Sequence, residues 1–552
     1  MRNATASGLA VVRAPAARRQ RPAATARRPG AHRIRLVGRP RHCARLPPRA
    51  RPAGPAAVGV SRTARRGSVV RAWHLRLTAR RPPARARLPL GYHSTPAIPA
   101  SRHLPSVPAR LFHLAWPVLI GQLAAMGMMV SDTMLVARYS TVDLAAVAVG
   151  SGIYVSIIFS LAGVLSALAP TIAHLYGAKR LDDIAPEFHQ GVWLALLLAM
   201  PGVILLCVPD PLLSLTQLAP DVETRTRAYL QVLAFGVPPA LVYRAVFMFN
   251  QAIGRPRPMM VLSLIGTTLH VPLSWALIHG TGPFPELGAI GCAVSNVVVY
   301  VTGCALGLAW ISRAAPYAPF RLFANWQAPR IAPIRALVRL GAPMGFSNFV
   351  EITSFALIAL FVGELGAAVV AGHRVVGNLH GLMFMMPLAL GTATLVLVGQ
   401  AAGAQDWPRA RRSALTGVAI AGALAIAFGL AVWLARASII ALYTPDPAVQ
   451  AVSLGLIGYS AVFLFFDATH TLASFSLRGY KVSFLPMLVH VVCFWGIGLA
   501  GGWWLCFRGL GSTVAPMGAA GFWAMSTLAT VAALLLIGGL LLKVGTAKVR
   551  GE

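Results

Sequence analysis

Long runs of apolar residues set the pattern of this chain from residue 111 onward. Each run is about 20 residues long, the length that an α-helix needs to cross the ~30 Å core of a bilayer. Backbone groups in lipid must satisfy their own hydrogen bonds, so the pattern predicts an all-α membrane protein rather than a membrane barrel. The predicted spans lie at about 112–137, 143–170, 188–208, 226–252, 258–280, 287–312, 333–362, 366–400, 411–442, 449–477, 484–507 and 517–542.

Lysine and arginine are unevenly distributed over the connections between these twelve segments. Seventeen of them follow even-numbered segments or lie beyond the last one, whereas five follow odd-numbered segments. Short cytoplasmic loops of membrane proteins collect basic residues. The asymmetry therefore predicts that both ends of the bundle chain, before the first span and after the last, are cytoplasmic.

The two halves of the apolar region carry matching positions. Because the offset covers an even number of predicted spans, both halves have the same topology, as in parallel repeats related by an axis along the membrane normal. We expect two six-helix lobes, 111–325 and 326–545, around a central cavity, and a cytoplasmic tail at 546–552. The matching pairs lie 225 or 226 residues apart: Pro117 and Pro343, Gly177 and Gly403, Asp221 and Asp446, Gly254 and Gly479.

Composition separates residues 1–110 from the rest. The 552-residue chain has a formal net charge of +34, but 25 of its 49 basic residues and none of its 15 acids lie in this leader, so the remainder carries only +9. A stretch rich in Arg, Ala and Pro cannot bury a core, which predicts disorder. There are two alternatives: an organellar transit peptide, and a basic arm that binds nucleic acid or anionic lipid. We favour an over-extended reading frame, and hence no nucleic-acid partner.

Three acidic residues lie inside predicted spans: Asp132, Glu351 and Asp467. A charge at the bilayer centre costs ~3 kcal/mol or more, so such residues are usually functional. Apolar surroundings favour the protonated form of a carboxyl, which can then exchange a proton, and the carboxylate can hold Na⁺ or an organic cation. We interpret the three as ion-coupling and substrate-binding residues. The alternative is a buried acid paired with a buried base, for which Arg244 and Arg374 are the candidates.

A histidine in the fifth predicted span adds a second candidate. His270 and Ser274 share one helix face at i, i+4 spacing. Such a histidine either packs through hydrogen bonds or titrates near physiological pH and relays protons to Asp132. The chain has no Walker motif, no H-E-x-x-H and no assembled catalytic constellation, so we expect a transporter without a cofactor, driven by an ion gradient.

Several motifs of residues 111–545 together resemble one family: Leu114-Ala115-Trp116-Pro117, Ser131-Asp132-Thr133, Tyr176-Gly177-Ala178, Val398-Gly399-Gln400-Ala401-Ala402-Gly403 and Leu477-Arg478-Gly479-Tyr480-Lys481. The chain resembles the multidrug and toxic compound extrusion (MATE) family, in its NorM-like branch. This resemblance implies a monomer in the bacterial inner membrane that exports organic cations in exchange for Na⁺ or H⁺. The family's coupling acids fall on Asp132, Glu351 and Asp467, and Glu351 and Asp467 become the candidate Na⁺ ligands.

The chain departs from the family pattern at two places. His270 and Ser274 stand where relatives usually have two Asn, and His373-Arg374 stands where they often have His-Gln. Arg374 would place a cation near the cavity, where it either repels cationic drugs or pairs with a carboxylate. A flippase for lipid-linked sugars is the alternative function, but its pyrophosphate site should be basic, whereas three acids face two arginines here. No pore-loop signature supports a channel.

Overall fold

The computed structural model describes residues 106–214, 218–509 and 515–551. The expected leader therefore lies outside the described residues, except for its last five. Of these, Val107–Arg110 already belong to the first helix, α1. The helical bundle thus begins before the expected boundary at residue 111.

Twelve helical spans in the described residues are long and apolar enough to cross a membrane, which confirms the predicted number. The first six are α1 (Val107–Ala137), α2 (Thr141–Leu165) with α3 (Leu168–Gly177), η1 (Leu181–Asp183) with α4 (Ile184–Cys207), α6 (Pro220–Ala252), α7 (Arg257–His279) and α8 (Ala289–Arg313). The short α5 (Asp210–Leu213) and η2 (Ala315–Phe320) lie in the connections.

The last six spans repeat this arrangement. They are α9 (Ile331–Val362) with η3 (Gly363–Leu365), α10 (Ala367–Gly403), α11 (Trp407–Leu434), α13 (Pro447–Gly479), α14 (Phe484–His490) with η4 (Val491–Gly501) and α15 (Gly502–Phe507), and α16 (Ala519–Arg550). The segment predicted at 411–442 is two helices, because α12 (Arg436–Tyr443) follows a break at Ala435. The eleventh span contains a π-helical stretch, η4, which the apolar pattern does not predict.

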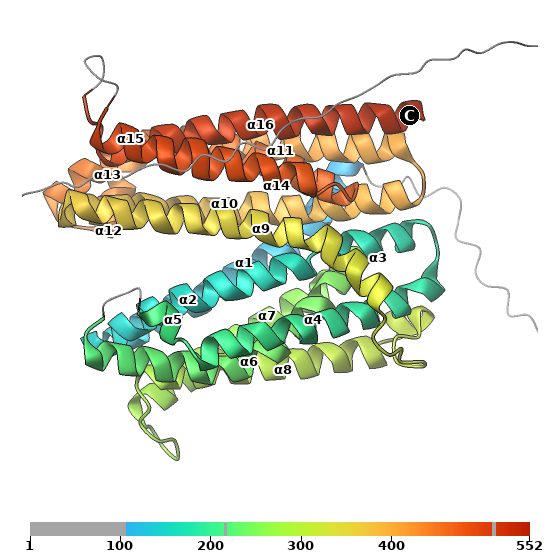
Figure 1. Ribbon diagram of the computed structural model, residues 1–552, viewed down its shortest axis with the longest axis horizontal. Coiled ribbons are helices and arrows are strands. Elements are labelled where there is room, and N and C mark those ends of the chain that lie inside the picture. The colour runs from blue at the N-terminus through green and yellow to red at the C-terminus, as the bar shows by residue number, and fades with distance from the viewer. Residues whose placement is uncertain (1–105, 215–217, 510–514, 552) are drawn as a thin grey trace, which may run out of the picture. The chain divides into compact units, whose positions relative to one another are not determined.

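The two halves form two layers of helices within this bundle (Figure 1). In the first half α6 packs against α8, α4 and α2, and in the second half α13 packs against α10, α11 and α16. The halves meet where α2 lies on α9 and where α1 and α3 lie on α10. Glycines allow the close approach of α2 and α9, since a Cβ on Gly163 would lie 2.5 Å from the Gly345 Cα atom. The predicted division into two six-helix lobes is confirmed.

Four turns at one end of the bundle have the same backbone path. After α3, α6, α10 and α13, respectively, Lys179, Gly254, Gln405 and Lys481 take the left-handed conformation, with φ of 57°, 76°, 59° and 62°. Gly254 therefore corresponds to Lys481, 227 residues on. The predicted match of Gly254 with Gly479 is wrong by two residues. We call the end of the bundle that contains these four turns the basic end, and the other end the opposite end.

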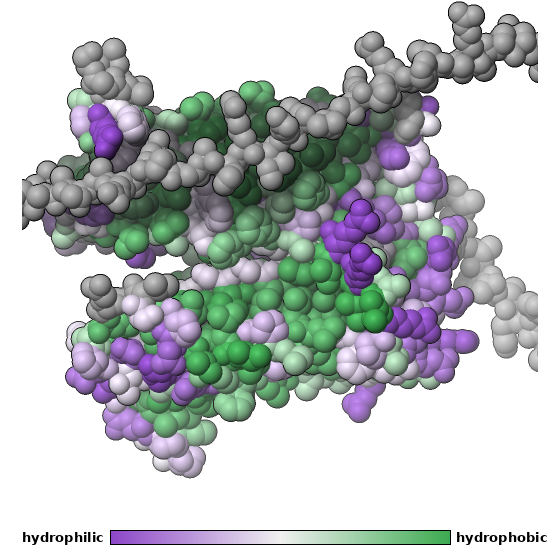
Figure 2. All heavy atoms as spheres, in the orientation of Figure 1, coloured by the Kyte–Doolittle hydropathy of each residue, from purple (hydrophilic) through white to green (hydrophobic). Residues whose placement is uncertain are grey.

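The surface shows where a bilayer would surround the bundle and where the lobes separate. Apolar side chains cover the length of the helices, and hydrophilic ones collect at both ends (Figure 2). The surface is hollowed between the lobes towards the opposite end, on the left of Figure 2, and is continuous between them nearer the basic end. The lobes thus touch at the basic end and part at the opposite end.

Asp143 ties together three helices of the first lobe. Its backbone N–H is capped by Ser140 Oγ at the start of α2. Both of its carboxylate oxygens accept from Arg225 of α6 at 2.7 Å, and one accepts from the Ala289 N–H at the start of α8 at 3.3 Å. Asp143 is 1% exposed, whereas the Arg225 side chain is 48% exposed, so the carboxylate is buried and the guanidinium reaches water. These bonds fix the height of α8 relative to α2 and α6.

We expect Asp143→Ala to lower the melting temperature of the purified protein by roughly 2–4 °C, because charge-assisted hydrogen bonds contribute on the order of 2 kcal/mol. Thermal unfolding in detergent measures this. Asp182→Ala, at an exposed residue, is the matched control and should leave the melting temperature unchanged. Equal melting temperatures for the two variants would show that Asp143 does not hold the three helices.

Candidate functional site

Asp132 lies five residues before the end of α1, with its carboxylate facing α7 and α8. His270 Nε2 is 2.8 Å from Asp132 Oδ1, and Asn296 Nδ2 donates to Asp132 Oδ2 at 3.0 Å. Ser274 Oγ also donates to Asp132 Oδ1, at 3.3 Å. Asp132 is 6% exposed and His270 is fully buried. The structure thus brings together the three candidate residues of the first lobe.

The second nitrogen of the His270 ring faces a hydroxyl that can either donate or accept. Ser295 Oγ lies 2.9 Å from His270 Nδ1 and 3.2 Å from the His270 carbonyl oxygen. A hydroxyl has one hydrogen and two lone pairs. If Ser295 donates to Nδ1, the ring is neutral. If it donates to the carbonyl oxygen, it can accept from a protonated Nδ1, and the ring is an imidazolium when Nε2 also carries a hydrogen towards Asp132.

Two residues of this site were missed at the sequence level, Ser295 and Asn296. Both lie on α8, and Asn296 also donates to the Cys292 carbonyl oxygen one turn earlier in the helix. The available signal was a polar pair inside the apolar run Ala293-Val294-Ser295-Asn296-Val297. That signal does not show that the two side chains point towards α1 and α7, because their orientation depends on how the helices pack.

The second lobe contains a separate site around Asp467 of α13. His380 Nε2 on α10 lies 3.3 Å from Asp467 Oδ2, and His470 Nδ1 lies 3.7 Å from Asp467 Oδ1. The Asp467 side chain is 2% exposed, and its Oδ1 atom has no hydrogen-bond partner among the described residues. His490 of α14 packs edge-on against His470, with ring centroids 5.6 Å apart. Asp467 is therefore surrounded by imidazole rings.

Glu351 of α9 belongs to the same site as Asp467. It interacts electrostatically with Asp467 and with the buried Arg478, although no direct ion pair joins them in the described part of the chain. Arg478 donates from Nη2 to Asn348 Oδ1, one turn before Glu351, at 3.3 Å. Two acids and one guanidinium of the described residues thus share this site.

The histidines and the arginine of this second site were missed. Arg478 was expected in a basic connection, because it adjoins Gly479, but it lies buried in the last turn of α13. His380, His470 and His490 are single polar residues in three apolar segments. Their only signal was their placement inside predicted spans, and only the packing of α10, α13 and α14 brings them together.

The two arginines proposed as partners for the buried acids do not pair with them. Arg244 of α6 lies over the Phe247 ring at 5.1 Å, and its buried Nε has no hydrogen-bond partner among the residues described. Arg374 of α10 is exposed. The buried acid–base alternative is therefore wrong for Arg244 and Arg374. Histidines and Arg478 take the places closest to the acids.

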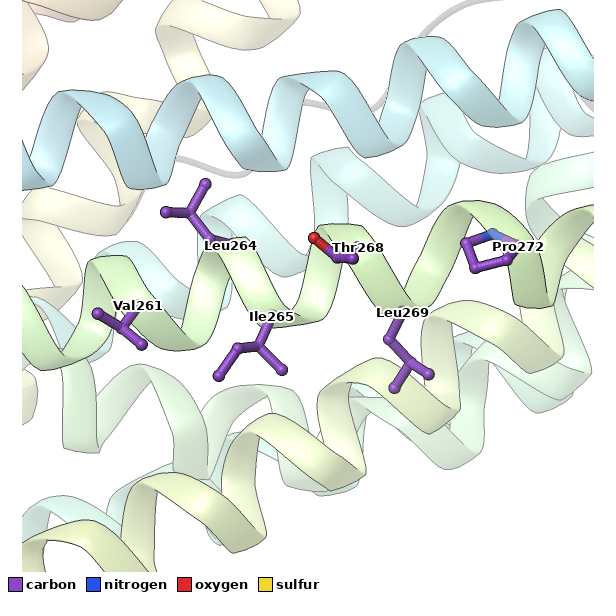
Figure 3. Close-up of a pocket in the computed structure, with 6 residues that line it drawn as sticks. All are labelled: Val261, Leu264, Ile265, Thr268, Leu269 and Pro272. Carbon is purple, nitrogen blue, oxygen red and sulfur yellow. The ribbon is translucent and has the colours of Figure 1, made fainter.

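An apolar groove on α7 lies apart from these sites (Figure 3). At 100° per residue the residues that line it share one helix face, opposite to His270 and Ser274. It contains no charged side chain, so it is suited to a hydrocarbon chain rather than to an ion. Its lining residues are Val261, Leu264, Ile265, Thr268, Leu269 and Pro272.

Comparison with known proteins places this arrangement in a family. The MatE family model matches residues 117–276 and 343–504, one match in each lobe. The chain is 51% identical over 436 residues to the "Probable multidrug resistance protein NorM" of Aromatoleum aromaticum, covering 79% of this chain and 94% of that protein. It is 37% identical over 416 residues to the "Multidrug resistance protein PmpM" of Pseudomonas aeruginosa, covering 74% of this chain and 87% of that one.

A solved structure supports the fold. The structure titled "Outward-facing conformation of a multidrug resistance MATE family transporter of the MOP superfamily" matches with a TM-score of 0.72 at 18% identity. The match covers 80% of this chain and 96% of the other. This similarity supports the two-lobed arrangement of helices. The evidence for the two sites is the set of contacts given above.

The hydrogen bond between Asp132 and His270 predicts energetic coupling. We expect Asp132→Asn, His270→Ala and the double variant to have melting temperatures that do not add, with a coupling energy of about 1.5–3 kcal/mol, typical of a hydrogen bond to a charged group. Thermal unfolding in detergent at one fixed pH completes the cycle. In the matched control cycle, Asp132→Asn is combined with His113→Ala, at an exposed residue of α1. The effects of this second pair on stability should be additive. Additivity for both pairs would contradict the contact.

Proposed function

The chain belongs to the MatE family, and on this premise we propose that it exports organic cations in exchange for protons that bind at its two carboxylate sites. The family model and the multidrug resistance proteins that it resembles support an ion-driven exporter of small molecules, not an enzyme. The observation that carries the choice of protons is the direct contact of Asp132 with His270.

The first-lobe site can take up and release a proton without moving heavy atoms. The Ser295 hydroxyl can donate either to the His270 ring or to the His270 carbonyl, and each choice suits one protonation state of the ring. A proton arriving at the pair turns a charged carboxylate with a neutral imidazole into a neutralised pair. His270 is then a proton relay, one of the two roles that the sequence left open for it, and Ser274 and Asn296 hold the carboxylate oxygens in place.

Nitrogen donors already occupy the oxygens that a sodium ion would need at Asp132. Hard cations select several oxygen ligands, whereas Nε2 of His270 and Nδ2 of Asn296 each face one oxygen of Asp132. This supports protons over Na⁺ at Asp132. In the second lobe His380 and His470 lie closest to Asp467. At Asp467 the support comes only from these two neighbouring imidazoles, because its Oδ1 atom has no hydrogen-bond partner among the described residues. Glu351 and Asp467, the candidate Na⁺ ligands, then act as proton acceptors that also attract the organic cation.

Competition between proton and substrate gives the coupling. An ionised Glu351 and Asp467 attract an organic cation, and their protonation removes that attraction. Aromatic rings border the site, with the Phe463 centroid 4.8 Å from that of His380 and the Phe494 centroid 5.7 Å from that of His470, and such faces bind cations. Since proton and drug bind the same groups, each lowers the affinity for the other, and transport needs only that the two lobe arrangements expose these groups to opposite sides.

Orientation follows from the loop charges. We propose that the basic end faces the cytoplasm of a bacterial cell, that the membrane is the inner membrane, and that both ends of the bundle chain lie inside. The hollow between the lobes at the opposite end then opens towards the periplasm (Figure 2). Each site is built within one lobe of one chain, which supports a monomer as the working unit.

A flippase for lipid-linked sugars is less well supported by these sites. A pyrophosphate group needs a cluster of basic side chains. In the described sites Arg478 is the one arginine. It donates to Asn348 and interacts electrostatically with Glu351. The charges therefore suit a cation.

We expect Asp132→Asn, Glu351→Gln and Asp467→Asn each to reduce efflux of a fluorescent organic cation by about tenfold or more, the scale of a coupling free energy between two ligands. The measurement uses cells with equal amounts of each variant in the membrane. Asp182→Asn, at an exposed acid, is the matched control and should export normally. Wild-type export by all three variants would contradict the assignment of the sites.

The coupling ion is tested in proteoliposomes with one gradient at a time. In Na⁺-free buffer, a pH gradient should drive the organic cation into the acidic compartment, because protons leave that compartment as the drug enters it. A Na⁺ gradient at equal pH on both sides should drive none. Export driven by Na⁺ alone would contradict proton coupling, while loss of the pH-driven response in the Asp132→Asn protein would show that Asp132 is required.

A further inference from the structure

Two hydrogen bonds join the spanning helices of the two lobes at the basic end. His174 of α3 places Nε2 2.8 Å from the Gly479 carbonyl oxygen at the end of α13. Gln400 of α10 donates from Nε2 to the Ala252 carbonyl oxygen at the end of α6, also at 2.8 Å. In the described part of the chain these are the two hydrogen bonds between spanning helices of different lobes.

The two bonds are copies of each other under the internal repeat. His174 and Gln400 lie 226 residues apart, which is the offset of α3 and the end of α10. Gly479 and Ala252 lie 227 apart, which is the offset shown by the left-handed turns, and each is the last residue of its helix. A side chain of each lobe therefore reaches the helix end of the other lobe at equivalent places.

The accepting carbonyls are suited to this role. The last carbonyl oxygens of a helix have no partner within it and carry the negative end of the helix dipole. The turn after α6 satisfies the carbonyls of Asn250 and Gln251 with N–H groups of Arg255 and Gly254. The Ala252 carbonyl oxygen accepts from Gln400 instead. When the lobes separate, this oxygen must accept from water.

Two glycines bring the backbones of α3 and α10 into contact beside these bonds. A Cβ on Gly177 would collide with the Gln400 carbonyl oxygen, and a Cβ on Gly403 would collide with the His174 carbonyl oxygen. The contact is reciprocal, because each glycine meets the residue that reaches across from the other lobe. Any larger side chain at Gly177 or Gly403 would keep the two helices apart.

We propose that His174, Gln400, Gly177 and Gly403 form a two-armed latch that holds the basic end closed and sets how often it opens. Both arms break together when α3 separates from α10, so their contributions add. The latch goes beyond ion exchange at the carboxylates and rests on the proposed function only in that the lobes must part at the basic end. Its strength sets the ratio of the two lobe arrangements, and not the affinity of either site.

The test measures the distance between the lobes at the basic end. Spin labels are attached at cysteines that replace the exposed Asp182 in the first lobe and Arg412 in the second, in a background without other reactive cysteines. Double electron–electron resonance in detergent at fixed pH then gives the ratio of open to closed protein. We expect His174→Ala and Gln400→Ala each to raise this ratio about fivefold, the effect of one neutral hydrogen bond, and the double variant about 25-fold.

Matched variants separate the latch from a general loss of structure. His174→Gln should behave as wild type, because the equivalent position already uses a glutamine. Gly403→Ala should raise the open share, whereas Gly377→Ala on the same helix, where a Cβ meets no atom within 4 Å, should not. Unchanged distances in His174→Ala and Gln400→Ala, or an equal effect of His174→Gln and His174→Ala, would overturn the proposal.

Failure of the latch and failure of the proposed function are distinguishable. The distance measurement needs neither substrate nor ion gradient, and Asp132→Asn leaves the latch residues intact. If export depends on Asp132 but the lobe distances do not change in His174→Ala and Gln400→Ala, the latch proposal is contradicted and the proposed function is supported. If the distances respond as expected while no proton or drug movement depends on Asp132, the latch stands and the ion sites are wrong.

Discussion

A carboxyl group inside a helix bundle in lipid must be protonated, accept hydrogen bonds or pair with a cation, because an isolated charge is too costly there. The rest of this structure depends on that constraint. Asp132 is met by His270 and Asn296, and Asp467 is met by His380 and His470. In the mechanism that we propose, neutralisation of the acids, separation of the lobes and release of the substrate follow from how these contacts change when a proton replaces a drug.

The repeat is close where the lobes touch and absent around the buried acids. At the basic end the side chains of His174 and Gln400 reach equivalent carbonyls, and the turns share one backbone path. At the sites, by contrast, the residue 226 positions after Asp132 is Ile358. A symmetric closure suits a movement in which both lobes take equal parts. Unlike sites allow the two lobes to hold different ligands at the same step.

The sequence predicted the spans, the repeat and the three acids because each leaves a signal along the chain: apolar length, a constant offset, or a charge where none is expected. It did not predict the partners of the acids. In the sequence Asn296 and His380 are single polar residues in apolar segments. Only the packing of α8 against α1 and of α10 against α13 brings them to the acids. Arg478 was assigned to a connection because helix ends cannot be located to within one turn from an apolar pattern. The π-helical η4, which packs against α9 and α16, has no signal in hydropathy.

The central claim is that proton and organic cation compete for the same buried acids. It is tested most directly by adding a lipophilic cation, such as tetraphenylphosphonium, to the purified protein in weakly buffered, Na⁺-free solution and following the pH with an indicator dye. The account predicts that binding releases protons, and that the release is reduced in Asp132→Asn and in Asp467→Asn. Binding of the cation with no proton released at any pH where the protein is folded would contradict it.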